Sequence, residues 1–232
     1  MRRLTQSLLC LILLLGLAAC GRPLTPNEVA FLQAMQGPQI NTGKVRFHDG
    51  LASKAVTFER PVRPRLTCME RIWPPSKGGT VTVSPAALTL FNHIFYREDV
   101  YLDDYMASYP ERLNLYGAML FAHEMTHVWQ WQNRARTGYT PLKAATEHQV
   151  SADPYLFDPE GNASFLSHGY EQQGAIVEEY VCCQVLDPSA PRTSRLRAMI
   201  SKEMPIGGLD EILDKADVII PWKGAETRNI CH

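Results

Sequence analysis

A His-Glu-Met-Thr-His pentapeptide at residues 123–127 lies within a strongly apolar, helix-like run. Two residues four positions apart lie on the same face of a helix, about one turn (roughly 5.4 Å) apart. His123 and His127 can therefore bind one metal ion, and Glu124 can accept the proton of a water activated by that metal. A buried helix that carries these residues by coincidence is less favoured, because an unpaired glutamate is rare on an apolar helix. The pattern requires this segment to be helical and predicts a zinc site.

The first twenty residues have the anatomy of a secretory signal. Two arginines precede an almost unbroken apolar run at residues 8–15, which is too short to span a bilayer as a mature helix. The Leu-Ala-Ala-Cys sequence at 17–20 resembles the lipobox of bacterial lipoproteins, which implies that residues 1–19 are removed and that Cys20 is lipidated. Because no aspartate follows Cys20, we expect attachment to the outer membrane, facing the periplasm. An ordinary signal peptide cleaved nearby is the alternative.

Net charge and length indicate which partners the chain can bind and how many domains it can form. Loss of the signal, which holds two arginines, changes the formal net charge from -1 to -3. No strongly basic stretch remains, so nucleic acid is not an expected partner. The mature chain is long enough for one sizeable core. We expect a lipid-anchored tether at 20–27 and a single domain at 28–232, mostly β at 28–108 and mostly α at 109–232.

Four cysteines remain after processing: Cys68, Cys182, Cys183 and Cys231. In an oxidising periplasm they can form two disulfides. A bond between the neighbouring Cys182 and Cys183 would be strained, so we expect each to pair with Cys68 or Cys231. Their spacings match no cysteine zinc site, and we do not assign them to the metal.

Hydrophobic periodicity gives a coarse secondary structure. A short helix is predicted at 29–36, and the β-branched and aromatic runs that follow predict a small, mostly antiparallel sheet. Apolar residues at three- and four-residue spacing then predict a long helix that begins at Pro110 and ends at Gly138. A loop-rich connection at 139–168 leads to a second helix at about 169–186. The predicted strands are 44–47, 55–58, 80–83, 87–91 and 94–96, and the predicted shorter helices are 142–148, 192–202 and 209–216.

The second long helix offers a third metal ligand. A catalytic zinc usually has three protein ligands and one open position. Glu171, Ala175 and Glu178 share one face of this helix through their i, i+4, i+7 spacing. The small Gly174 and Ala175 allow another helix to approach closely. Glu171 is geometrically reasonable as a ligand if the two helices pack antiparallel with a loop between them, and His148 is the reserve candidate.

These two segments resemble a group of bacterial zinc metallopeptidases that are often associated with Rhs-type and type VI secretion proteins. The group usually carries H-E-M-T-H-V-W-Q and then E-Q-Q-A-E-I-V-x-D-Y; this chain has HEMTHVWQ at 123–130 and EQQGAIVEEY at 171–180. The resemblance covers roughly residues 85–182 and departs at Gly174 and Ala175, where Ala-Glu is usual. It implies an α+β, zincin-like fold of the gluzincin type, with a small antiparallel sheet packed on the active-site helix and a helical C-terminal part. It also implies a secretion-system partner.

The residue pattern and the resemblance assign the same roles at the predicted centre. His123 and His127 bind Zn2+ as neutral imidazoles, and Glu171 is the third ligand. Glu124 is the general base, which takes a proton from the attacking water and later passes it to the leaving amine.

Other side chains are candidates for supporting roles. Tyr155, His168 and Tyr170 precede the third ligand, and any of them can donate to the tetrahedral oxyanion, although each taken alone is more commonly structural. Glu178 or Glu179 is a candidate to orient a ligating histidine through a hydrogen bond. A solvated helix face explains these two glutamates equally well.

We therefore expect a membrane-anchored zinc metallopeptidase that cuts peptide or protein substrates. The segment 91–95 is the expected edge strand above the metal, where an extended substrate can pair. The main alternative is a non-catalytic lipoprotein whose zinc site serves stability or partner binding and is closed by a fourth protein ligand, such as His148 or His168. Hydrolysis of a non-peptide amide ranks third, because the sequence shows no glycan platform beyond scattered tryptophans.

Overall fold

The structure is a computed structural model that describes residues 21–51, 57–213 and 215–232. The predicted signal at 1–19 and the predicted lipidation of Cys20 lie outside the described residues. Within that described part, no helix is long and apolar enough to cross a membrane.

The chain is docked on the domain from Arg22 onward, within the stretch 20–27 that the sequence analysis expects to be a tether. The backbone of Arg22 exchanges two hydrogen bonds of 2.8 Å with Phe47. The Arg22 guanidinium also donates to both carboxylate oxygens of Glu28, each at 2.8 Å. Glu28 is fully buried, so this ion pair fixes the entry of the chain into the domain.

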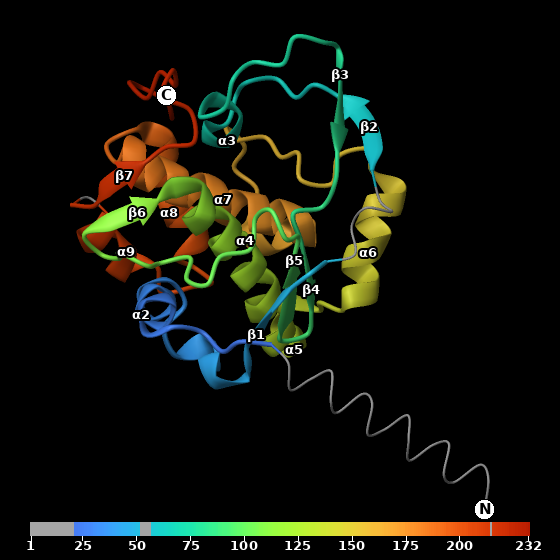
Figure 1. The fold of residues 1–232 in the computed structure, drawn as a ribbon, viewed down its shortest axis with the longest axis vertical. Helices are drawn as coiled ribbons and strands as arrows, with labels where there is room; N and C mark the ends of the chain where they lie inside the picture. Colours follow the sequence, from blue (N-terminus) through green and yellow to red (C-terminus); the bar gives the residue numbers. More distant parts are fainter. Residues whose placement is uncertain (1–20, 52–56, 214) are drawn as a thin grey trace, which may run out of the picture.

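The described strands form three small sheets (Figure 1). In the first, β5 (His93–Tyr96) lies between β1 (Arg46–Asp49) and β4 (Ala87–Leu90). The β1–β5 pair is parallel and the β4–β5 pair is antiparallel. The second sheet is the antiparallel pair of β2 (Phe58–Pro61) and β3 (Thr80–Val83). The expectation of a mostly antiparallel sheet is therefore only half correct, because one of the two pairings in the first sheet is parallel.

The third sheet corrects the predicted start of the long helix. Arg112–Asn114 form strand β6, which pairs in parallel with β7 (Asp217–Ile219). The helix α4 begins only at Leu115, where the Asn114 side chain accepts a hydrogen bond of 3.1 Å from the Gly117 amide. Helix periodicity could not reveal this strand, because its partner lies about a hundred residues further along the chain.

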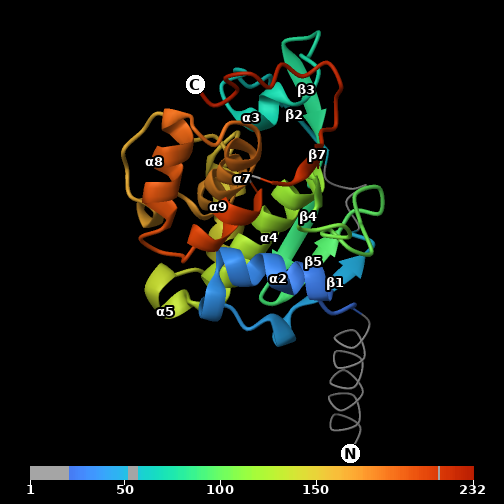
Figure 2. The ribbon, with the colours of Figure 1, turned by 90° about the vertical axis from the view of Figure 1, so that its left-hand side faces the viewer.

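Two long helices form the centre of the molecule: α4 (Leu115–Gln132) and α7 (Tyr170–Leu186), which lie side by side in Figures 1 and 2. Almost the whole of α4 is buried, which explains its continuous apolar sequence. The long helix ends at Gln132 and not at Gly138 as predicted, because the chain turns at Asn133. Gly138, with a left-handed φ of 69°, ends the short helix that follows. The other helices are α2 (Pro26–Met35), α3 (Cys68–Arg71), α5 (Arg134–Thr137), α6 (Pro141–Val150), α8 (Pro191–Ile200) and α9 (Gly207–Leu213).

The three-stranded sheet packs on α4 through aromatic side chains. Phe47 on β1 contacts Tyr96 on β5 and Phe121 on α4 edge to face, with ring centroids 5.3 and 5.9 Å apart. Such contacts add to the free energy of apolar burial. They hold β4 beside the half of α4 that carries the H-E-x-x-H sequence. The predicted α+β class, with small sheets and several helices, is confirmed.

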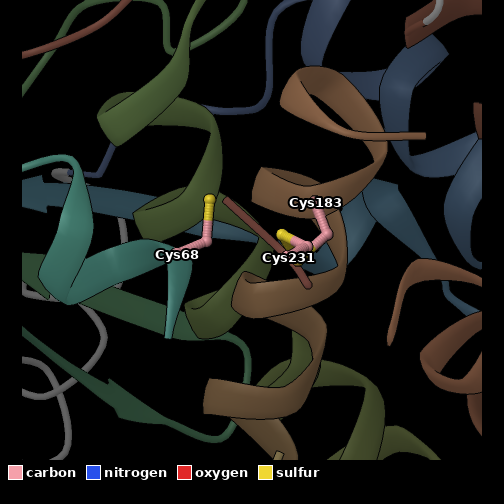
Figure 3. Close-up of side chains that lie close together, drawn as sticks. All are labelled: Cys68, Cys183 and Cys231. Atoms are coloured by element: carbon pink, nitrogen blue, oxygen red, sulfur yellow. A yellow bond between two sulfur atoms is a disulfide. The ribbon is translucent and has the colours of Figure 1, made fainter. Parts of the chain in front are cut away.

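Two disulfides join distant segments to α7, Cys68–Cys182 and Cys183–Cys231. The prediction that the vicinal cysteines bond elsewhere is confirmed. Sulfur atoms of Cys68, Cys183 and Cys231 all lie within 4.8 Å of one another (Figure 3). The bonds therefore meet at one buried point, where they attach α3 and the C-terminal segment to the same turn of α7.

Replacing Cys183 and Cys231 together by alanine should lower the free energy of unfolding. The bond spans a sequence separation of 48 residues. Closing a loop of that size lowers the conformational entropy of the unfolded chain, which stabilises the folded protein by about 4 kcal/mol. Denaturant unfolding of the variant and the wild type measures the difference. Equal stability of the two proteins would contradict the role given to this bond.

Candidate metal centre

Helices α4 and α7 bring three of the predicted residues together. His123 and His127 project from α4, and Glu171 projects from the first turn of α7. One donor atom from each residue lies within 4.8 Å of the other two, and all three side chains are buried. Within the part of the chain that the structure describes, this is a set of residues that can hold a metal ion.

The spacing of these atoms fits ligands of a common ion. Oε2 of Glu171 lies 3.4 Å from Nε2 of His123 and 3.2 Å from Nε2 of His127. Charge-assisted hydrogen bonds are shorter, about 2.7–2.9 Å. In a tetrahedral zinc site with bonds of about 2.0–2.1 Å, neighbouring ligand atoms are roughly 3.3 Å apart. The donor set of two imidazoles and a carboxylate is also one that catalytic zinc sites use.

Gln130 fixes the tautomer of His127. Its amide nitrogen donates to the Tyr170 carbonyl at 3.1 Å and to Oε1 of Gln173 at 3.0 Å. The amide oxygen of Gln130 therefore faces Nδ1 of His127, at 2.9 Å, and Nδ1 must carry the hydrogen. This leaves the lone pair of Nε2 free for a metal. The sequence analysis did not identify Gln130, although its position three residues after His127 was the available signal.

Glu178 holds the other imidazole. Its Oε2 lies 3.4 Å from Nδ1 of His123, so the Nε2 atom points toward Glu171. Of the two glutamates that the sequence offered for orienting a histidine, Glu178 is thus the one that lies beside His123. Glu179 points elsewhere: it accepts from the Cys68 amide at 2.8 Å and from Arg192 at 3.1 Å. Burial raises the pKa of Glu179 to about 7, although Arg192 opposes this effect.

The surrounding charges keep Glu171 ionised and attract a positive charge to the histidines. Burial alone would raise the pKa of Glu171, but His127, His123 and His148 hold that pKa well below its usual range. Burial opposes protonation of His123, yet Glu171 and Glu178 raise the pKa of its imidazole well above the usual value. A cation at this position would therefore be compensated by buried carboxylates.

Glu124 lies on α4 between the two histidines and faces a cleft. The Thr89 hydroxyl on β4 donates to Oε2 of Glu124 at 2.7 Å, which fixes the carboxylate against the sheet. Thr89 was not identified from the sequence, because the pairing of β4 with α4 is a tertiary contact. The adjoining cavity of about 210 Å³ is lined by residues that include His123, Glu124, His148, Tyr155 and Glu178.

Of the three predicted oxyanion donors, the structure brings one to the cleft. The Tyr155 ring lies 5.7 Å from the His123 ring and 5.6 Å from the His148 ring, measured between centroids. Burial and then the nearby carboxylates raise the pKa of Tyr155 well above its usual value, so its hydroxyl stays protonated. Tyr170 points its hydroxyl at the Thr137 carbonyl, 3.4 Å away, and Nδ1 of His168 contacts the Ser164 carbonyl at 2.9 Å.

The structure also bears on two further expectations, His148 as a metal ligand and the segment 91–95 as an edge strand. His148, the reserve third ligand, contacts Glu171 itself: its Nε2 lies 3.1 Å from Oε1 of Glu171. The edge strands of the described three-stranded sheet are β1 and β4 rather than the segment 91–95, because β5 is paired on both sides. His93, on β5, pairs with His48 at 2.9 Å.

Comparisons with known proteins give one relationship. The chain is similar to the type VI secretion system spike protein VgrG2b of Pseudomonas aeruginosa, with 24% identity over 191 residues. The match covers 82% of this chain, but the chain spans only 16% of that relative's length. A solved structure, the effector domain of Pseudomonas aeruginosa VgrG2b, aligns with 22% identity and a TM-score of 0.47 over 78% of this chain and 82% of that chain. No family model matches. The similarity to a type VI secretion protein agrees with the secretion association of the group that the sequence resembles.

Gly174 is a position where α7 approaches His123 closely. A Cβ atom placed there would lie 2.8 Å from the His123 imidazole. Gly174→Ala should therefore displace this ring and weaken zinc binding by about 5- to 150-fold, since overpacking costs about 1–3 kcal/mol. Competition with a chromophoric chelator measures the affinity. Gly207→Ala is the matched control, because nothing lies within 4 Å of a Cβ at that position. Unchanged affinity in Gly174→Ala would contradict the close approach.

Proposed function

We propose that this chain is a zinc-dependent hydrolase of peptide bonds with a gluzincin-like centre. The observation that carries the proposal is the convergence of His123, His127 and Glu171 beside a cleft that also holds Glu124. A zinc ion bound by these three residues supplies a Lewis acid and lowers the pKa of water to about 7. The remaining chemistry belongs to side chains of the protein.

Glu124 is the proposed general base. Thr89 occupies one of its carboxylate oxygens, and the side chain lines the cleft from within the helix that carries both histidines. It takes a proton from the attacking water as the bond to the scissile carbonyl forms. The same carboxyl then gives that proton to the amine nitrogen as the peptide bond breaks, so that Glu124 returns to its starting state.

Tyr155 is the proposed donor to the oxyanion. Its ring is held between His123, His148 and the Arg63 guanidinium, which lies 5.6 Å from the ring centroid. Because its pKa is raised, the phenol keeps its hydrogen and can donate it to an oxygen that becomes negative.

The cleft suits an extended peptide. Ala87, the first residue of β4, lines the cavity, and β4 is one of the two edge strands of its sheet among the described strands. An exposed edge can add a substrate segment as a further strand, in which main-chain hydrogen bonds position the scissile bond. Apolar side chains of the cavity, including Met69, Tyr116 and Leu120, would surround a neighbouring side chain of the substrate.

The non-catalytic alternative requires a closed metal site. A structural zinc site has four protein ligands, whereas the group found among the described residues has three, and His168 points away from it. His148 reaches Glu171 on the oxygen that faces away from the two histidines. The arrangement therefore supports an open site better than a closed one.

We also propose a lipid-anchored location in the bacterial envelope, on the outer membrane and facing the periplasm. The signal-like residues 1–19 and the lipobox-like Cys20 support it, and the two disulfides suit an oxidising compartment. The similarity to a type VI secretion spike protein supports a secretion-system protein as partner, with peptides or proteins as substrate.

Glu124→Gln should abolish peptide cleavage while zinc stays bound. The amide cannot accept a proton, and a general base contributes about 10²–10⁴-fold to the rate. Cleavage and zinc content are measured on protein lacking residues 1–20, with Glu211→Gln, an exposed glutamate on α9, as the control. Equal cleavage by Glu124→Gln and wild type would contradict the mechanism. Bound zinc without cleavage in either protein would favour the non-catalytic alternative.

Tyr155→Phe should lower kcat/KM by about 10²–10³-fold, because it removes one donor to the oxyanion. Tyr170→Phe and His168→Ala should stay within about twofold of wild type, since both side chains point away from the cleft. Steady-state kinetics on one peptide substrate compares the three variants. A larger loss in Tyr170→Phe or His168→Ala than in Tyr155→Phe would contradict the assignment.

A further inference from the structure

We propose that two consecutive residues of α6, Glu147 and His148, form a positioning device for the third metal ligand, Glu171. His148 holds one carboxylate oxygen of Glu171, so that only the other oxygen faces the metal. Glu147 fixes the backbone from which that ligand projects. The inference rests on the proposed metal site, but it concerns residues outside the H-E-x-x-H and Glu171 pattern.

Glu147 caps α7 from another helix. The residue before α7 is Gly169, which has no side chain with which to cap it. Oε1 of Glu147 instead accepts from the Tyr170 amide at 2.8 Å, and Oε2 accepts from the Glu171 amide at 3.0 Å. These amides are among the unpaired donors that every helix start presents, and negative charge is favourable there.

The glycine at 169 makes room for this cap. A Cβ atom at that position would lie 3.1–3.2 Å from the carboxylate of Glu147, closer than nearly all such contacts. Glycine therefore permits a carboxylate from a different helix to reach the first amides of α7. Because the amide of Glu171 itself is one of the two donors, Glu147 fixes the position of the ligand's own backbone.

His148 acts on the ligand's side chain. Its Nε2 lies 3.1 Å from Oε1 of Glu171, whereas Oε2 faces His123 and His127. A carboxylate engaged in this way presents a single oxygen to a metal. If both oxygens bound the metal, the second would occupy the position that a catalytic zinc keeps open for water. Hydrogen-bonded partners of metal ligands commonly change metal affinity by about 10–100-fold.

The two contacts come from one short helix at the edge of the cleft. His148 lines the cavity and its side chain is 36% exposed, so it is accessible from the cleft. Tyr155, the proposed oxyanion donor, contacts the His148 ring at 5.6 Å between centroids. The end of α6 thus links the backbone of the ligand, its carboxylate and the cleft.

The test uses protein lacking residues 1–20 and compares wild type with His148→Ala, His148→Gln, Glu147→Ala and His168→Ala. Zinc affinity is measured by chelator competition, the absorption spectrum is recorded with Co2+ in place of zinc, and melting temperatures are measured without metal. These readouts do not depend on peptide cleavage. His168→Ala is the matched control, because that histidine lies in the same connection but its imidazole contacts the Ser164 carbonyl and not Glu171.

His148→Ala should weaken zinc binding by about 10–100-fold. It should also reduce the cobalt absorption, because a second oxygen of Glu171 raises the coordination number. His148→Gln should restore most of the zinc affinity and of the cobalt absorption, since the glutamine amide can donate to Oε1 of Glu171. Glu147→Ala should lower the melting temperature of the metal-free protein by several degrees as well as the affinity, whereas His148→Ala should leave that temperature nearly unchanged.

Other outcomes overturn the inference. Wild-type affinity and spectrum in His148→Ala would leave no positioning role. A loss far beyond 100-fold without rescue by glutamine would make His148 a ligand itself. If wild type bound no metal, the inference and the proposed function would fail together. If wild type bound metal and the variants behaved as expected but no peptide were cleaved, only the proposed function would fail.

Discussion

The close packing of α7 against α4 is the contact on which the candidate centre depends. The two helices approach where Gly174 faces the His123 imidazole, and a methyl group at that position would already overlap the ring. This approach brings a carboxylate from the first turn of α7 to within 3.4 Å of the Nε2 atoms of His123 and His127 on α4. The ligands alone would not form a site if the helices lay farther apart.

The rest of the fold holds these helices in that arrangement. The three-stranded sheet packs on α4 and places Thr89 against Glu124. Both disulfides attach to adjacent residues of α7, and the buried pair of Glu179 and Arg192 lies one turn before them. From the other end, Glu147 caps the first turn of α7. The helix that supplies the third ligand is therefore fixed at both ends, which suits a ligand that must be placed before a metal arrives.

The sequence predicted the features that are local or follow from helical spacing. The i, i+4 histidines, Glu171 with Glu178 on one face and the helices after residue 139 all depend on such rules. For the disulfides the sequence excluded a Cys182–Cys183 bond but left open which of the two pairs with Cys68 and which with Cys231. It could not separate Tyr155 from His168 and Tyr170, because all three lie in a loop-rich connection whose path is set by tertiary contacts. The β6–β7 pair, the Thr89–Glu124 contact and the cap by Glu147 were missed for the same physical reason. Each joins residues that no local pattern relates.

The central claim is that His123, His127 and Glu171 hold one zinc ion with an open position. X-ray absorption spectroscopy of the zinc-loaded protein tests it most directly. With three protein ligands and one water, zinc should have four nitrogen or oxygen neighbours at about 2.0–2.1 Å with the scattering pattern of two imidazoles, and His123→Ala should lose one imidazole. Sulfur neighbours at about 2.3 Å, or the pattern of three or more imidazoles, would contradict it.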